Sequence, residues 1–147
     1  AWEYFIMLLD KFTGGVVPIR FIAFSLVGGL GLIVHLIVLA GMFKGLGTTF
    51  LWAQSGATMV AMTSNYVLNN VLTYRDMRLR GWAFVRGWVS FVLACSVGAL
   101  ANVGIADYLF HKEGNFWVSS AIAGVLVGAV WNYAVTAVYT WKKPKAG

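Results

Sequence analysis

Long apolar stretches separated by short polar segments dominate the pattern of this chain. Four stretches cover residues 21–43, 50–74, 88–110 and 116–141. Each is longer than the ~20 residues that a helix needs to cross the hydrocarbon of a bilayer. None shows the period of two that is typical of a barrel strand, and lipid offers no hydrogen-bond partner to an open backbone. The pattern therefore predicts an all-α membrane protein with four transmembrane helices.

An internal repeat relates the first two stretches to the last two. An offset of 67 residues, without a gap, aligns Asn65-Tyr66 with Asn132-Tyr133. The same offset pairs other identical residues: Phe24 with Phe91, Gly31 with Gly98, Phe43 with Phe110, Gly47 with Gly114 and Thr73 with Thr140. Polar matches at the ends of membrane spans have no generic cause. Because a unit with two spans keeps its orientation, the halves are expected to be two parallel two-helix repeats.

Residues 1–17 carry apolar side chains at helical spacing, with Glu3, Asp10 and Lys11 between them. This pattern predicts an amphipathic interfacial helix, a juxtamembrane linker that precedes a four-helix domain at 18–147. An ordinary fraying terminus is the alternative. No secretory signal is expected, because the first apolar stretch is followed by charged residues and lacks a small-residue cleavage site. The chain also lacks an initiator Met, which leaves open that it is a fragment of a longer protein.

Composition and charge agree with a membrane location and add an orientation. Hydrophobic residues make up 60 % of the chain and charged residues 11 %, which excludes most soluble classes. Of the 11 Lys and Arg residues, nine flank the same side of the predicted spans: Lys11, Arg20, Arg75, Arg78, Arg80, Arg86, Lys142, Lys143 and Lys145. Only Lys44 and Lys112 lie on the other side. The positive-inside rule then predicts that both termini and the middle loop are cytoplasmic.

Features of soluble enzymes are scarce. Cys95 is the single cysteine, so neither a disulfide framework nor a thiolate metal site is available. His35 and His111 lie far apart along the predicted bundle, which argues against a metal site. The glycines of Gly28-Gly29-Leu30-Gly31 favour close helix packing over dinucleotide binding. We expect no catalytic residue, no cofactor, no metal and no nucleic-acid partner.

Polar side chains inside the predicted spans are the candidate functional residues. The intramembrane set comprises Asn65, Asn69, Asn70, Asn132, His35 and Asn102. Such groups must find a partner or line a wet cavity. A polar path across the membrane is one interpretation, and interhelical hydrogen bonds worth about 0.6 kcal/mol each are the other.

Basic and aromatic residues border this set on the predicted cytoplasmic side. Four arginines are the candidate phosphate-binding and lipid headgroup-binding residues: Arg75, Arg78, Arg80 and Arg86. Guanidinium groups bind phosphate oxygens in bidentate fashion, although simple anchoring to anionic lipid would also explain them. Four aromatic residues are candidates for stacking on a sugar or bordering an acyl chain: Tyr66, Tyr74, Tyr133 and Trp141.

The same residues carry a resemblance to a known family. The chain from Pro18 to Lys143 resembles the GtrA-like family in five segments: Arg20-Phe21, Val27-Gly28-Gly29, the run from Asn65 to Asn70, the run from Leu72 to Asp76, and Trp131-Asn132-Tyr133 with Thr140-Trp141. The string from Asn69 to Gly81 is similar to the variant fused behind a family 2 polyprenol-phosphate glycosyltransferase. In both halves Asn-Tyr replaces the Asn-Phe pair common in the family.

The resemblance implies a bacterial inner-membrane protein of polysaccharide or glycolipid synthesis. Its expected activity is the flipping of a polyprenyl-phosphate-linked sugar from the cytoplasmic leaflet. The expected partners are that lipid-linked sugar, membrane lipids and a family 2 glycosyltransferase, with a homo-oligomer also plausible. The alternative is a module that docks the glycosyltransferase and its lipid acceptor without transport. A cation exporter is disfavoured, because no acidic residue lies in the middle of a span.

Overall fold

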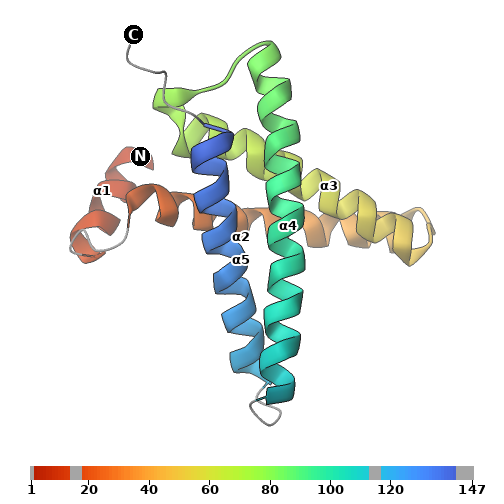
Figure 1. The fold of residues 1–147 in the computed structure, drawn as a ribbon. Coiled ribbons are helices and arrows are strands. Elements are labelled where there is room, and N and C mark those ends of the chain that lie inside the picture. Colours follow the sequence, from red (N-terminus) through yellow and green to blue (C-terminus); the bar gives the residue numbers. More distant parts are fainter. Residues whose placement is uncertain (1, 14–17, 113–116, 142–147) are drawn as a thin grey trace. The chain divides into compact units, whose positions relative to one another are not determined.

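The computed structural model describes residues 2–13, 18–112 and 117–141 (Figure 1). All regular elements within these ranges are helical, which confirms the predicted all-helical class for the described part of the chain. The elements are α1 (Trp2–Thr13), α2 (Ile19–Ala40), η1 (Gly41–Gly45), α3 (Phe50–Leu68), η2 (Asn69–Thr73), η3 (Arg75–Met77), α4 (Trp82–Lys112) and α5 (Trp117–Tyr139). The π-helical turns η1 and η2 continue α2 and α3, and η3 is a single 3₁₀ turn. The chain forms two compact units, Ala1–Arg78 and Leu79–Gly147.

The first unit is built around α2 and α3, which run in opposite directions (Figure 1). Their connection is short and tightly hydrogen-bonded. The backbone N–H and the hydroxyl of Thr48 both donate to the Met42 carbonyl, at 3.1 and 2.9 Å. Gly47 adopts a φ of 65°, a left-handed conformation that glycine reaches without a steric penalty. The first two apolar stretches are therefore joined by a short hairpin.

Small side chains bring α2 and α3 together. Ala53, Ala57 and Ala61 recur at every fourth position of α3 and are buried. This spacing places them on one face of the helix, where Phe24 and Val27 of α2 are also buried. Helices in lipid associate through close packing rather than through exclusion of water, so such small-residue faces are typical of membrane helix pairs.

The second unit repeats this arrangement with α4 and α5, which lie side by side and antiparallel in Figure 1. Phe91 on α4 is buried, and so is Gly128 on α5. The 67-residue offset relates Phe91 to Phe24 and Gly128 to Ala61. The helix-pair core of each unit is thus formed by equivalent positions of the repeat.

The ends of the two pairs also match in backbone geometry. The Tyr74 N–H donates to the Asn69 carbonyl at 2.8 Å, and the Trp141 N–H donates to the Thr136 carbonyl at 3.0 Å. Both hydrogen bonds span five residues, as in a π-helix, instead of the four of an α-helix. An aromatic side chain is buried at each of these widened turns, because Tyr74 and Trp141 are both 1 % exposed.

Large apolar side chains cover the outside of the helices. On α2 five of them are between 46 % and 66 % exposed: Leu30, Leu32, Ile33, Leu36 and Ile37. Contiguous apolar surfaces of this kind mark a contact with lipid or protein. Within the described residues, Ile19–Gly45 and Trp82–Ala101 are long and apolar enough to cross a membrane, and Leu126–Tyr139 is a shorter apolar helix. The crossing of all four helices stays a prediction.

The start of the third apolar helix differs most from the prediction. The third apolar helix begins at Trp82 and not at residue 88, because Gly81, with a φ of 59°, starts it directly after the extended segment 78–80. Trp82-Ala83-Phe84-Val85 is compatible with a helix and extends α4 backwards. Arg86, which precedes the predicted third stretch, therefore lies on the first turns of α4.

The N-terminal segment forms the predicted helix as α1, over Trp2–Thr13. Its apolar side chains Tyr4, Phe5, Met7 and Leu8 are exposed. Residues 14–17 of the predicted juxtamembrane segment lie outside the described residues. An exposed apolar face is what an interfacial helix presents to lipid, and its membrane position stays a prediction.

Candidate functional site

A polar stripe continues the alanine face of α3 towards its C-terminal end. Asn65, Asn69 and Thr73 follow the same spacing of four residues. The Asn69 amide donates to the Asn65 backbone carbonyl at 2.9 Å, and the Thr73 hydroxyl donates to Asn69 Oδ1 at 2.7 Å. Asn69 and Thr73 are buried. The stripe is therefore a connected set of hydrogen bonds that lies within the first unit.

The Asn65 carboxamide packs against a glycine of the neighbouring helix. A Cβ added to Gly31 would lie 2.6 Å from Asn65 Cγ and closer still to its Oδ1 and Nδ2. Asn65 Oδ1 is buried without a conventional hydrogen-bond partner. Because the absent Cβ lies along a Cα–H bond of glycine, the oxygen faces that hydrogen, as in weak Cα–H···O contacts between helices. Gly31 is thus required by the amide opposite it.

The second unit contains the same contact. A Cβ added to Gly98 would lie 2.9 Å from Asn132 Cγ, and Asn132 Oδ1 is likewise buried without a conventional partner. The indole of Trp131 adds a second neighbour, at 3.0 Å from the added Cβ. The Trp131 Nε1–H donates to the Ala94 carbonyl at 3.1 Å, which fixes the indole in place. Gly98 and Asn132 are the repeat equivalents of Gly31 and Asn65.

An ion pair closes the α3 end of the first unit. Arg20 at the start of α2 donates to both carboxylate oxygens of Asp76, at 2.9 and 2.5 Å. Its Nη1 also lies 3.3 Å from the Thr73 carbonyl, and the guanidinium is 5.3 Å from the centre of the Tyr74 ring. Neither Arg20 nor Asp76 is among the site residues that the sequence predicts. Their opposite charges on one side of the predicted spans were the signal that could have found them.

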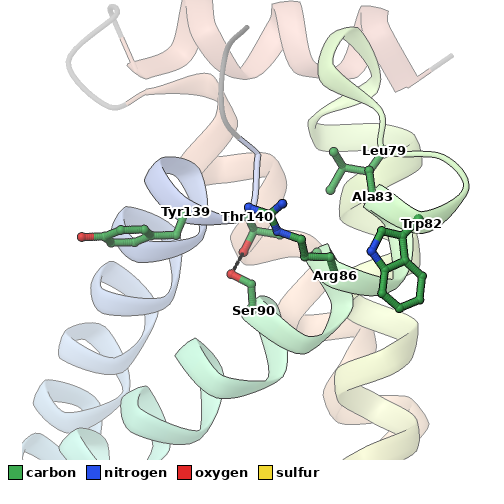
Figure 2. Close-up of a pocket in the computed structure, with 8 residues that line it drawn as sticks. Leu79, Trp82, Ala83, Arg86, Ser90, Tyr139 and Thr140 are labelled. Atoms are coloured by element: carbon green, nitrogen blue, oxygen red, sulfur yellow. Dashed lines mark hydrogen bonds between the residues drawn. The ribbon is translucent and has the colours of Figure 1, made fainter. Parts of the chain in front are cut away.

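A pocket of about 270 Å³ opens at the corresponding end of the second unit (Figure 2). Its lining residues come from the start of α4 and the end of α5: Leu79, Trp82, Ala83, Arg86, Gly87, Ser90, Tyr139 and Thr140. The hydroxyls of Ser90 and Thr140 are hydrogen-bonded at 3.0 Å. Figure 2 shows the Arg86 side chain extending from α4 towards the end of α5, beside this hydroxyl pair. The pocket therefore combines one cation, two hydroxyls and an apolar wall.

The four predicted phosphate-binding arginines do not share one unit. Arg75 and Arg78 belong to the first unit and Arg80 and Arg86 to the second. Arg75 forms an ion pair with Glu3 of α1, while Arg78 and Arg80 are exposed. Arg86 lines the pocket. The structure thus associates one of the four with a concave site.

The predicted aromatic residues lie mostly inside the helix packing. Tyr66, Tyr74 and Trp141 are at most 1 % exposed, and Tyr133 is half-buried. The Trp141 ring packs edge-to-face on Phe91, with centroids 5.9 Å apart. These rings have a packing role here, and stacking on a sugar stays a prediction.

The remaining predicted polar residues are distributed over three helical elements. Asn70 is buried in η2, and His35 is half-buried on α2. The side chain of Asn102, the repeat equivalent of His35, lies outside the described residues. The predicted pairing of these two positions between helices therefore has no geometric test.

Antiparallel helix pairs with apolar outer faces, buried amides and a basic pocket define a helical membrane protein. The chain belongs to the GtrA/DPMS transmembrane domain family, which matches residues 23–141. The family is associated with translocation of sugars on lipid glycosyl carriers, and its membrane domain is not itself catalytic. No curated protein matches the chain.

Proposed function

We propose that this domain flips a polyprenyl-phosphate-linked sugar from the cytoplasmic to the outer leaflet of a bacterial inner membrane. In this proposal the four long helices span the bilayer with both termini in the cytoplasm, as the distribution of Lys and Arg predicts. The family to which the chain belongs supports the class of substrate. The apolar outer faces of the helices support a location in lipid.

The pocket beside Arg86 is the observation that carries the proposal. A volume of about 270 Å³ is near the lower limit of ligand pockets, ~300 Å³, so it suits a headgroup and leaves the polyprenyl chain in lipid. The Arg86 guanidinium is the natural partner of the phosphate. The Ser90 and Thr140 hydroxyls offer hydrogen bonds to phosphate or sugar oxygens, and the exposed Trp82 ring borders the acyl chain.

A polar stripe leads away from this pocket along α5. Thr140, Thr136 and Asn132 are each four residues apart and therefore lie on one face of the helix. Thr136 donates to the Asn132 carbonyl at 2.5 Å. Hydroxyl and amide groups at successive depths can exchange hydrogen bonds with a passing sugar. Passage requires α4 and α5 to separate at Asn132, because its carboxamide now packs on Gly98.

Leaflet exchange in liposomes tests the proposal. Liposomes that contain only this chain are loaded with a labelled polyprenyl-phosphate sugar, and a membrane-impermeant reagent reports the outer-leaflet fraction. We expect exchange above that of empty liposomes. Arg86→Gln should reduce the rate at least tenfold, whereas Lys44→Gln, which removes one positive charge from the first unit and none from the pocket, should not. Equal rates for these two variants would contradict the role of the pocket.

The contacts of the two amides favour a second candidate function. Asn65 and Asn132 pack on glycines, so both polar stripes are closed helix contacts in this structure. A module that docks a family 2 glycosyltransferase and holds its lipid acceptor would need the pocket but no path. Replacing Asn65 and Asn132 together by Leu separates the two functions. The translocase loses exchange and keeps lipid binding, while the docking module shows no exchange even before substitution.

A further inference from the structure

The pocket and the Arg20–Asp76 ion pair occupy equivalent places in the two halves of the repeat. The 67-residue offset relates Gly87 to Arg20 and Thr140 to Thr73. In the second unit, Gly87 and Thr140 line the pocket. In the first unit, Arg20 lies beside Thr73, with Nη1 3.3 Å from its carbonyl oxygen. The same corner of a helix pair is open in one half and occupied by the Arg20–Asp76 ion pair in the other.

The charges explain why the two corners differ. Each half carries an arginine near the start of its first long helix: Arg20 in the first half and Arg86 in the second. By the 67-residue offset, Arg86 corresponds to the position just before Arg20. Arg20 is held by a bidentate contact to Asp76. The sequence places Lys143 where the first half has Asp76. Among the described residues, no acidic group pairs with Arg86.

We propose that the two corners are one anion site in duplicate, and that the Asp76 carboxylate fills the copy in the first half. A carboxylate and a phosphate offer a guanidinium the same pair of parallel hydrogen bonds, so Asp76 stands where a phosphate oxyanion would bind. The ligand class is a phosphate monoester or diester, on a lipid or free. This inference rests on the proposed function in assigning a phosphate to the Arg86 corner.

The duplicate site predicts how many phosphate groups each variant binds. The wild-type chain binds one phosphate, at Arg86. Asp76→Ala removes the carboxylate that Arg20 binds through two hydrogen bonds, so a second phosphate binds in its place beside Thr73 and Tyr74. Further replacement of the guanidinium, in Asp76→Ala with Arg20→Gln, abolishes the second site and leaves the first.

Native mass spectrometry of the full chain in detergent, with farnesyl phosphate as the probe and farnesol as the uncharged control, counts the bound molecules. We expect one for the wild type, two for Asp76→Ala and one for the double variant. An unchanged count in Asp76→Ala would overturn the inference. Asp76→Asn, which keeps the size and one acceptor of the side chain, gives the same comparison if the alanine variant does not fold.

The counts also separate this inference from the proposed function. Zero for the wild type and one for Asp76→Ala would reject the Arg86 pocket and uphold the filled site at Arg20. One for both would uphold the pocket and reject the filled site. Inorganic phosphate, titrated in the same experiment, distinguishes the sources of the anion. Displacement of farnesyl phosphate by millimolar inorganic phosphate would identify free phosphate, and no displacement would identify a lipid headgroup.

Discussion

The contact between Gly31 and Asn65 predicts an unusually sharp response to a single methyl group. An ordinary Cβ contact is 3.4–4 Å, whereas the Cβ of alanine at position 31 would lie 2.6 Å from Asn65 Cγ. The Asn65 side chain must therefore retreat by at least about 0.8 Å, and overpacking of this kind costs about 1–3 kcal/mol. The higher helix propensity of alanine offsets up to about 1 kcal/mol of this cost. We expect Gly31→Ala to lower the free energy of unfolding by about 0–2 kcal/mol.

A neighbouring glycine supplies the matched control. A Cβ added to Gly29 meets nothing within 4 Å, so Gly29→Ala changes helix propensity alone. Comparing the two variants cancels this term and isolates the overlap with Asn65. The difference between their unfolding free energies should be about 1–3 kcal/mol.

The partner residue should relieve the overlap. Asn65 Oδ1 has no conventional hydrogen bond, so Asn65→Ala alone loses only a weak Cα–H···O contact of about 0.5–1 kcal/mol. Combining it with Gly31→Ala should restore most of the lost stability, because the added methyl group then has room. In the second unit the rescue should be incomplete, since Trp131 remains 3.0 Å from the Cβ at position 98.

Reversible unfolding by SDS in mixed micelles, followed by far-UV circular dichroism, measures each corner of this double-mutant cycle. The reasoning would be refuted if Gly31→Ala were as stable as Gly29→Ala. It would also be refuted if Asn65→Ala added its own loss to that of Gly31→Ala, because independent effects would mean that the side chains do not meet.

Three further predictions use the same assay. Asn69→Leu removes the acceptor of the Thr73 hydroxyl and should cost about 1–3 kcal/mol, of which Thr73→Val in the same chain should recover a part; no recovery would contradict the hydrogen bond. Glu3→Gln breaks an ion pair with Arg75 whose side chains are more than half exposed, so the change should stay below about 1 kcal/mol and vanish at high salt. Phe91→Ala removes a buried ring from the core of the α4–α5 pair and should lower the free energy of unfolding by about 3–5 kcal/mol. A loss below about 1 kcal/mol would show that the ring is not packed there.

Local patterns in the sequence predicted much of this architecture. Helix positions followed from the apolar runs. The 67-residue offset indicated which positions share a role, and the structure gives the pairs Phe24 with Phe91 and Tyr74 with Trp141 the same burial. These features depend on periodicity, which acts between residues close in the chain.

Contacts between helices could not be predicted from these local patterns. Asn65 was visible as an intramembrane amide, but its apposition to Gly31 depends on the depth at which two helices cross. The Arg20–Asp76 pair joins residues 56 positions apart, and a long arginine side chain has several acids or carbonyls within reach. The pocket is lined by Gly87 at the position where the repeat places Arg20 in the other half. Spacing along the chain selects the face on which a residue lies, and the close approach of two faces selects what it touches.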